Sequence, residues 1–383
     1  MRKRQIAIAS PFIGDEEKKA VVEPLNTGWM TQGPQVAAFE KEFAIAHRVP
    51  YALATTSCTT ALHLGLSALG LRPGDEVIVP AFTWVATANV VEYCGATPVF
   101  VDVDPETFNM LPQAVGTAVT ERTKAVIPVH LFGLCADMDA IRSAVPKDVF
   151  LLEDAACAAG AMYRGRFAGS LGDAAAFSFH PRKIITTGEG GMLTTVNDDL
   201  HQHSEILRNH GATVSEEMRH EGPTPYLLPD FNVLGFNYRM TDMQAAVGRV
   251  QLQRLETLLK ERREYARVYT EQLSEVSWLH MPLEPADYKH SYQSFVTRIA
   301  ADAPIKRNDL MARLQEYGIS TRPGTHAVTE LGYYSKKYAL PSGQFASAKR
   351  LQETTMAIPL HNRMSQDDYD YTISCILQVA KEL

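Results

Sequence analysis

Lys183 stands between an apolar run and a glycine-rich turn, a position in which a lysine can do chemistry. Residues 177–191 read FSFHPRKIITTGEGG. A lysine amine forms a Schiff base with a carbonyl compound only when it is neutral, and partial burial favours the neutral amine. Glycines in the following turn allow the backbone to approach a ligand closely. Taken alone, the same lysine could be an ordinary exposed turn residue, which is the usual position of lysine.

An acidic pair upstream gives Lys183 a partner of suitable chemistry. Residues 151–158 read LLEDAACA, so Asp154 ends an apolar run that is typical of a buried strand. If pyridoxal phosphate binds here, an aspartate against the pyridine nitrogen keeps that nitrogen protonated and makes the ring an electron sink. The alternative for Asp154 alone is an N-cap on a following alanine-rich helix. Considered together, Asp154 and Lys183 favour the catalytic interpretation.

Two further strand ends carry residues that could hold a phosphate and a planar ring. Residues 56–62 read TSCTTAL, a small polar turn before an amphipathic helix, and the first amides of a helix bind phosphate. Ser178, five residues before Lys183, could donate to the same phosphate. Residues 80–84 read PAFTW, and Trp84 could lie flat against a ring, although an isolated tryptophan is more often a core residue.

Short apolar runs alternate with helical patterns between residues 50 and 195, which predicts a mostly parallel sheet inside a three-layer α/β domain. Ligands bind such sheets at the carboxyl ends of the strands, where the residues above lie. Helices are expected at Thr59–Leu69, Ala86–Cys94 and Asp137–Ser143. The seven expected strands are Tyr51–Thr55, Glu76–Pro80, Thr97–Val101, Lys124–Val129, Val149–Leu152, Ala174–Phe179 and Met192–Thr195.

A long helical pattern follows from Thr241 to Leu273, with Thr241 as its N-cap. A helix of this length could connect two domains or lie along a partner subunit. The rest of the chain predicts a smaller α/β domain with a strand near Ser294–Ile299 and a final helix from Gln366. We expect a large domain over residues 1–250, with an N-terminal arm, and a small C-terminal domain over residues 251–383.

Composition excludes several classes of protein. The chain has 383 residues, 45% of them hydrophobic, and a net charge of −7 with both signs interspersed, so no basic patch for nucleic acid is expected. No run of about 18 apolar residues predicts a membrane span. Five cysteines without close pairs favour reduced thiols in a cytoplasm over a disulfide framework or a metal site.

Ordered motifs over nearly the whole chain resemble the DegT/DnrJ/StrS family of sugar aminotransferases, within the fold type I pyridoxal-phosphate enzymes. Beyond the stretches already described, the motifs are GWMTQGP at 28–34, VHLFG at 129–133, RNHG at 208–211 and GFNYRM at 235–240. Each motif alone is weak, and their common order carries the resemblance.

The resemblance implies a role for each matching residue. Lys183 corresponds to the Schiff-base lysine, which also moves protons, Asp154 to the partner of the pyridine nitrogen and Trp84 to the stacking aromatic. Ser178 and the backbone of Cys58 and Thr59 correspond to the phosphate site. Asn237 corresponds to an asparagine that reaches the phosphate of the neighbouring subunit, which implies a homodimer with shared active sites.

One position departs from the family pattern, and three others are candidates for substrate binding. Cys157 lies where relatives often carry Gln or His against the cofactor's ring hydroxyl, and a thiol is a weak donor. The resemblance places Glu189, Arg239 and His326 near the substrate. Glu189 could instead only brace its turn, and His326 could be an ordinary loop histidine.

The resemblance implies transfer of an amino group from L-glutamate to a nucleotide-linked keto-sugar. The turn at 186–190, TTGEG, resembles that of C4 aminotransferases, including perosamine-type enzymes, so we expect a 4-keto-6-deoxy sugar. A C3 aminotransferase or a dehydratase of the same family is one alternative, although dehydratases carry histidine in place of Lys183. A non-catalytic regulatory or sensor protein is another, and the joint presence of Lys183, Asp154 and Ser178 argues against it.

Overall fold

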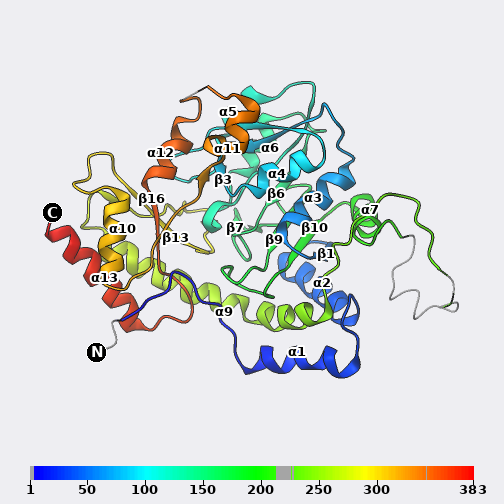
Figure 1. The fold of residues 1–383 in the computed structure, drawn as a ribbon, viewed down its shortest axis with the longest axis horizontal. Coiled ribbons are helices and arrows are strands. Elements are labelled where there is room, and N and C mark those ends of the chain that lie inside the picture. The colour runs from blue at the N-terminus through cyan, green and yellow to red at the C-terminus, as the bar shows by residue number, and fades with distance from the viewer. Residues whose placement is uncertain (1–3, 213–225, 227, 342) are drawn as a thin grey trace.

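Seven strands form one large sheet in the order β1-β10-β9-β6-β5-β2-β4. Figure 1 labels β1, β10, β9 and β6 of this sheet, which lie side by side. The structure is a computed structural model that describes residues 4–212, 226, 228–341 and 343–383. The strands, in chain order, are β1 (Tyr51–Thr55), β2 (Glu76–Pro80), β4 (Thr97–Val101), β5 (Thr123–Val126), β6 (Phe150–Asp154), β9 (Ala174–Ser178) and β10 (Gly191–Thr195). All seven predicted strands are therefore present.

Most of this sheet is parallel. Neighbours among β4, β2, β5, β6 and β9 run in the same direction, whereas β10 runs antiparallel to both β1 and β9. β5 ends at Val126 instead of the predicted Val129. Pro128 has no amide hydrogen and so cannot continue the ladder as a donor, although its carbonyl still accepts from Asp154. The prediction of a mostly parallel seven-stranded sheet is confirmed.

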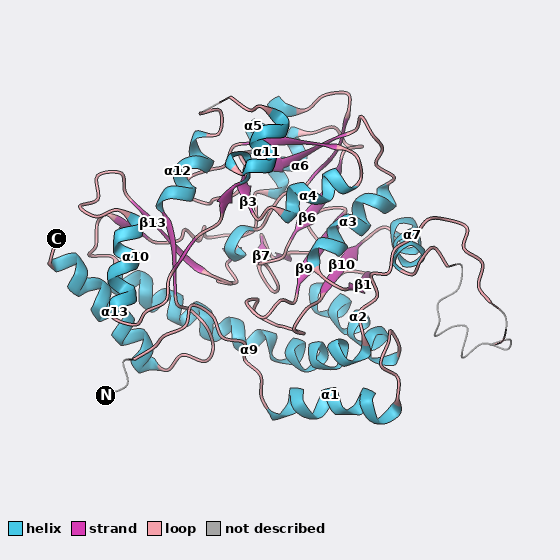
Figure 2. Cartoon of the chain, in the orientation of Figure 1, coloured by secondary structure: helices cyan, strands magenta, loops and turns pink. Residues whose placement is uncertain are grey.

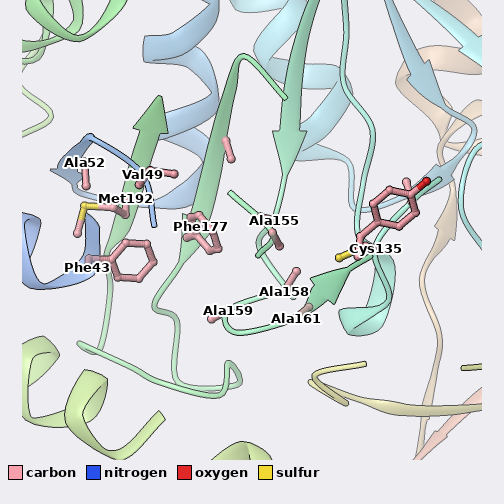
Figure 3. Packing of buried hydrophobic residues seen from close by; sticks show 14 of the residues in the cluster. Phe43, Val49, Ala52, Cys135, Ala155, Ala158, Ala159, Ala161, Phe177 and Met192 are labelled. Carbon is pink, nitrogen blue, oxygen red and sulfur yellow. The ribbon is translucent and has the colours of Figure 1, made fainter. Parts of the chain in front are cut away.

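Side chains along each strand point alternately to the two faces of the sheet, so the core is divided into two layers. Ala175 and Phe177 of β9 belong to one buried cluster, and Ala174 and Ala176 belong to the other. Figure 3 shows Phe177 near Phe43 of α2, and their ring centroids lie 5.0 Å apart. The first face is covered by α2 (Pro34–His47), α5 (Pro112–Ala118) and α6 (Met138–Ala144), and the second by α3 (Cys58–Leu69), α4 (Ala86–Tyr93) and α7 (Asp198–Arg208).

The long helix α9 (Asp242–Leu273) runs beneath both parts of the molecule, with α1 (Asp15–Thr27) on its outer side (Figure 1). Thr241 caps it as predicted, because its side chain accepts from the amide of Gln244. Leu258 packs in the large-sheet core and Tyr269 in a third, C-terminal cluster. The helix thus joins two cores, and the division at residue 250 stays a prediction.

The C-terminal part is a small α/β unit around a four-stranded sheet, in the order β11-β13-β16-β14. Figure 2 shows β13 of this sheet in magenta, with cyan helices beside it. Together with the three-layer domain it confirms the predicted fold class. The elements of this part are β11 (Leu279–His280), β12 (Tyr288–Lys289), β13 (Phe295–Ile299), α10 (Arg307–Glu316), β14 (Arg322–Pro323), β15 (His326–Ala327), η2 (Val328–Glu330), α11 (Gly332–Tyr338), α12 (Ala346–Thr354), β16 (Thr355–Ile358) and α13 (Gln366–Lys381).

Short strands join the C-terminal part to the loops of the large sheet. β15 pairs with β3 (Phe82–Thr83), directly after β2, and β12 pairs with β7 (Met162–Tyr163), which also pairs with β8 (Arg166–Phe167). A single helical turn, η1 (Leu131–Gly133), follows β5. Segments more than 100 residues apart in the chain therefore meet where the parallel strands end.

Candidate active site

Gly191 packs against the peptide bond between Ser57 and Cys58, at the start of α3. A Cβ atom on Gly191 would come within 2.3 Å of the Ser57 carbonyl carbon and 2.6 Å of the Cys58 nitrogen. Ser178 is paired with Gly191 across β9 and β10, so it lies beside the same turn. The amides of Cys58 and Thr59 open the helix and cannot find carbonyl partners within it. This cradle of helix amides and close backbone suits an anion such as phosphate.

The two acids at the end of β6 point to opposite faces of the sheet. Glu153 is fully buried and accepts hydrogen bonds from three backbone amides of the 169–172 loop at 2.7–2.8 Å. It also accepts from His130 Nε2 at 2.8 Å, whose Nδ1 accepts from the amide of Ala136. Because the lone pairs of Glu153 are taken by these donors, it holds a loop in place, and only Asp154 faces α3.

Asp154 is buried, and its carboxylate has two donors. Thr87 Oγ1 donates at 2.8 Å and the amide of Ala156 donates at 3.1 Å. Burial raises the pKa of Asp154, and these hydrogen bonds together with the charge of Lys183 offset only part of that rise. The alternative that Asp154 caps an alanine-rich helix is wrong, because residues 155–160 form turns that place Cys157 in the site.

The amine of Lys183 donates to Cys157 Sγ at 3.2 Å and lies near Asp154 and Cys58. Burial lowers the pKa of Lys183, but the sulfurs of Cys157 and Cys58 and the carboxylate of Asp154 outweigh it, so the pKa lies above its ordinary value. The direction of this shift runs against the expectation of a partly neutral amine in the free protein. Burial raises the pKa of the Cys58 thiol well above its usual range.

Trp84 lies at the surface instead of in the core. Its side chain is 60% exposed, so the alternative that it is a core tryptophan is wrong. His326 is exposed too, and its ring lies 5.8 Å from that of Trp84 at an angle of 45°. The pairing of β3 with β15, which sets His326 opposite Thr83, holds the two rings together. An aromatic side chain with a free face at this position can cover a planar ligand.

The segment with Asn237 and Arg239 runs beside the end of β1. Thr55 bridges to Arg239, and Arg239 donates to Asn209 Oδ1 at 2.7 Å. The side chain of Arg239 is therefore held in part by its own chain. Asn237 bridges to Asn209 through the backbone and is exposed. This chain thus leaves Asn237 at the surface, next to the turn that opens α3.

Glu189 braces the turn after Lys183 through its backbone. Its carbonyl accepts from Thr187 Oγ1 at 2.6 Å and from Gln244 Nε2 at 2.8 Å. The side chain of Glu189 is exposed. Glu189 therefore helps to hold the turn through its main chain, and its exposed carboxylate remains accessible to a ligand.

Three polar contacts of the site were missed by sequence reasoning. Thr87 is bonded to Asp154, Ser291 Oγ donates to the carbonyl of Cys157 at 2.9 Å, and Gln293 Nε2 donates to the carbonyl of Arg182 at 2.9 Å. The only signal for Thr87 was a threonine among the otherwise apolar buried residues of α4. No local pattern marks Ser291 or Gln293, which come from more than 100 residues downstream.

The described part of the chain offers neither a metal centre nor a membrane-spanning helix. Within the described ranges, no three His, Cys, Asp or Glu side chains are arranged to hold a metal ion. No helix of the part of the chain that the structure describes is both long and apolar enough to cross a membrane. All five cysteines are free thiols.

Comparisons with known proteins agree with this geometry. The model of the DegT/DnrJ/EryC1/StrS aminotransferase family matches residues 11–377. The spore coat polysaccharide biosynthesis protein SpsC of Bacillus subtilis is 39% identical over 374 residues, which cover 97% of this chain and 96% of that protein. The GDP-perosamine synthase of Caulobacter vibrioides is 38% identical over 378 residues, which cover 98% of each.

A solved structure is similar over the same extent. A proposed sugar aminotransferase of Streptococcus pneumoniae, in its PMP form, superposes with a TM-score of 0.93 and is 30% identical in sequence. The similarity covers 99% of this chain and all of that chain. The match therefore includes the large sheet, the C-terminal part and the site between them.

Proposed function

Because the chain belongs to the DegT/DnrJ/EryC1/StrS aminotransferase family, whose members are sugar aminotransferases that use pyridoxal phosphate, we propose that it aminates a nucleotide-linked 4-keto-6-deoxy sugar at C4. L-glutamate would supply the amino group and leave as 2-oxoglutarate. The observation that carries this proposal is the convergence of Lys183, Asp154 and Cys58 beside the anion cradle.

The residues present fit pyridoxal phosphate. The first amides of α3 would take the phosphate, and the missing side chain of Gly191 lets β10 pack directly against the Ser57–Cys58 peptide that opens this helix. Trp84 has an exposed face that would cover the ring. The bound cofactor, joined to Lys183, supplies an electron sink for the carbon that exchanges a proton. Asp154, which is buried and fixed by Thr87, would keep the ring nitrogen charged and that sink effective.

Lys183 would carry the proton between carbon atoms. Its amine is positioned by Cys157 Sγ at 3.2 Å. In the first half-reaction the amine, neutral once glutamate has displaced it from the cofactor, would take a proton from the α-carbon of glutamate and pass it on to the cofactor. In the second it would return a proton to C4 of the sugar. Buried walls around the amine would keep water away from this transfer.

The choice of C4 rests on the turn after Lys183 and on one relative. Residues 186–190 resemble the turn of C4 aminotransferases, and the 38% identical relative is a GDP-perosamine synthase. The exposed Glu189 carboxylate could accept hydrogen bonds from sugar hydroxyls. His326, beside Trp84, and Arg239 are further candidates for substrate contact. The nucleotide would extend from the site towards solvent.

We further propose a homodimer in which Asn237 reaches the phosphate of the partner's site. Asn237 is exposed, and the segment before it carries large apolar side chains in contact with solvent: Leu228 is 88% exposed, Phe231 55% and Leu234 93%. Apolar side chains gathered in this way mark protein interfaces. A second copy of the chain would cover them and complete the site.

The test is incubation with ¹⁵N-glutamate and matched 3-keto and 4-keto sugar nucleotides, followed by NMR of the products. We expect nitrogen at C4 in a reaction that requires Lys183. Nitrogen at C3 alone would overturn the regiochemistry and leave the family assignment intact. Cofactor binding without transfer to any sugar nucleotide would instead favour the sensor alternative.

A further inference from the structure

The segment His290–Ser294 of the C-terminal part is bonded to both loops that carry the site. Ser291 Oγ donates to the carbonyl of Cys157 at 2.9 Å, and Gln293 Nε2 donates to the carbonyl of Arg182 at 2.9 Å. Cys157 is the hydrogen-bond partner of Lys183, and Arg182 is its neighbour in the chain. The segment is therefore bonded to the backbone of Cys157 and to that of the residue before Lys183.

The backbone of this segment is itself fixed on the large domain. The amide of Ser291 donates to the carbonyl of Gly133 at 3.0 Å, and the amide of Ser294 donates to that of Phe132 at 3.3 Å. Ser291 is fully buried, and a Cβ atom on Gly133 would come within 2.2 Å of its hydroxyl oxygen. Only glycine at position 133 leaves room for this contact.

Two buried side chains, those of Arg262 and His290, also fix the backbone of this segment. Arg262 of α9 donates to the carbonyl of Tyr292 at 3.0 Å and to that of Leu360 at 3.1 Å. Burial, aided by the charge of Arg263, lowers the pKa of His290 to about 3. The imidazole is therefore neutral near pH 7, and its Nδ1 accepts from the amide of Tyr292 at 2.8 Å.

Backbone strain marks both sides of this junction. Tyr292 and Phe132 have φ values of 47° and 58°, in the left-handed region that residues other than glycine seldom adopt. Such conformations persist where the surrounding structure fixes them, and they cluster at functional sites. The side-chain amide of Gln293 is also oriented, because its Oε1 accepts from Ser294 Oγ at 3.2 Å and its Nε2 is then turned to Arg182.

We propose that Ser291 and Gln293 are positioning residues that set the distance between the Lys183 amine and its partners. The segment 290–294, which we term the clamp, ties the loop after β6 and the loop after β9 to one rigid point. The inference rests on the proposed role of Lys183. Reacting groups must be held close to their productive geometry, and a displacement of about 1 Å can cost about 100-fold in rate.

The experiment compares Ser291→Ala, Gln293→Met and the double variant with Thr297→Val. Thr297 is a matched control, because its buried hydroxyl also donates to a backbone carbonyl, that of Met356 at 2.9 Å, within the C-terminal sheet. The first readout is the rate of the glutamate half-reaction against glutamate concentration. The second is iodoacetamide labelling of Cys157, mapped by mass spectrometry relative to the part-exposed Cys94.

Each clamp variant should slow the half-reaction by about tenfold or more at saturating glutamate, with little change in the glutamate concentration for half-maximal rate. Labelling of Cys157 should become several-fold faster, while Cys94 is unchanged. The double variant should be close to the slower single variant, because one rigid unit loses its function once. Thr297→Val should lower only the unfolding temperature.

Three outcomes would overturn the clamp: unchanged rate and labelling in Ser291→Ala and Gln293→Met, equal changes in Thr297→Val, or multiplicative effects in the double variant. The labelling needs no cofactor or sugar, so it tests the clamp on its own. If instead the unaltered protein shows no Lys183-dependent absorbance with pyridoxal phosphate, the proposed role of Lys183 is wrong. The labelling result would still decide whether the clamp holds Cys157.

Discussion

The hydroxyl of Thr87 donates a hydrogen bond of 2.8 Å to the buried carboxylate of Asp154. A threonine hydroxyl has a single proton, so Thr87 must accept in its contact of 3.0 Å with Thr83 Oγ1. A buried relay of two hydroxyls thus ends on the one acid that faces α3. It lowers the pKa of Asp154 against the effect of burial, which raises it.

Thr87→Val should therefore raise the pKa of Asp154 further and reduce the fraction ionised. We expect the acid limb of the pH–rate profile for the glutamate half-reaction to move to higher pH, with the rate at high pH less affected. Thr83→Val, one bond further from the carboxylate, should move the limb less. Coincident profiles for Thr87→Val and the unaltered protein would show that Thr87 has no influence on this carboxylate.

Asp154→Asn should slow transamination by about 10²–10³-fold while the cofactor still binds. The same substitution, which slows the reaction, should stabilise the fold. Because the pKa of Asp154 is raised on folding, the carboxyl group stabilises the folded state at pH values below its ordinary pKa. This stabilisation is lost as the pH rises and the buried group must ionise. The variant without cofactor should consequently unfold at a higher temperature than the unaltered protein at pH 7, measured by calorimetry. Near-normal turnover would mean that Asp154 only orders its turn.

Lys183 should be the residue that carries the cofactor. Borohydride reduction of the protein with pyridoxal phosphate, followed by peptide mapping, should place the modification on Lys183. Lys183→Arg keeps the positive charge beside Cys157 and Asp154 and should lose both the label and the visible absorbance band. A label on another lysine would refute the assignment.

Gly191→Ala should close the phosphate cradle. The new methyl group would meet the Ser57–Cys58 peptide at 2.3–2.6 Å, so α3 or β10 must shift, at a cost of about 1–3 kcal/mol in stability. Affinity for pyridoxal phosphate, measured by fluorescence titration, should fall at least tenfold. Gly332→Ala is the control, since no atom lies within 4 Å of its added Cβ. Equal affinities in the two variants would place the phosphate elsewhere.

Asn237 should act in the site of a partner subunit. Asn237→Ala and Lys183→Ala should each be inactive, yet a refolded mixture should regain about a quarter of full activity, because half of its dimers are hybrids with one intact site. Sedimentation of the unaltered protein at decreasing concentration should show activity lost together with the dimer. An active monomer, or no complementation, would contradict the shared site.

Local signals in the sequence determined most of the elements. Apolar runs located all seven strands of the large sheet, and Thr241 with the periodic pattern after it located α9 to its last residue, Leu273. These features depend on neighbours in the chain, as hydrophobic period and helix capping do. The order of the motifs at strand ends indicated the family. Those motifs meet in one site because parallel strands bring their carboxyl ends to the same edge of the sheet.

Tertiary structure alone decided how those residues meet. Which member of the Glu153–Asp154 pair faces α3 depends on which side of the sheet that helix covers. The pKa of Lys183 depends on Cys58 and Cys157, which reach it from two other loops. Ser291 and Gln293 bond to the site across more than 100 residues of chain. Hydrogen bonds and charges act through space over a few ångströms, so contacts between distant segments leave no periodic trace in the sequence.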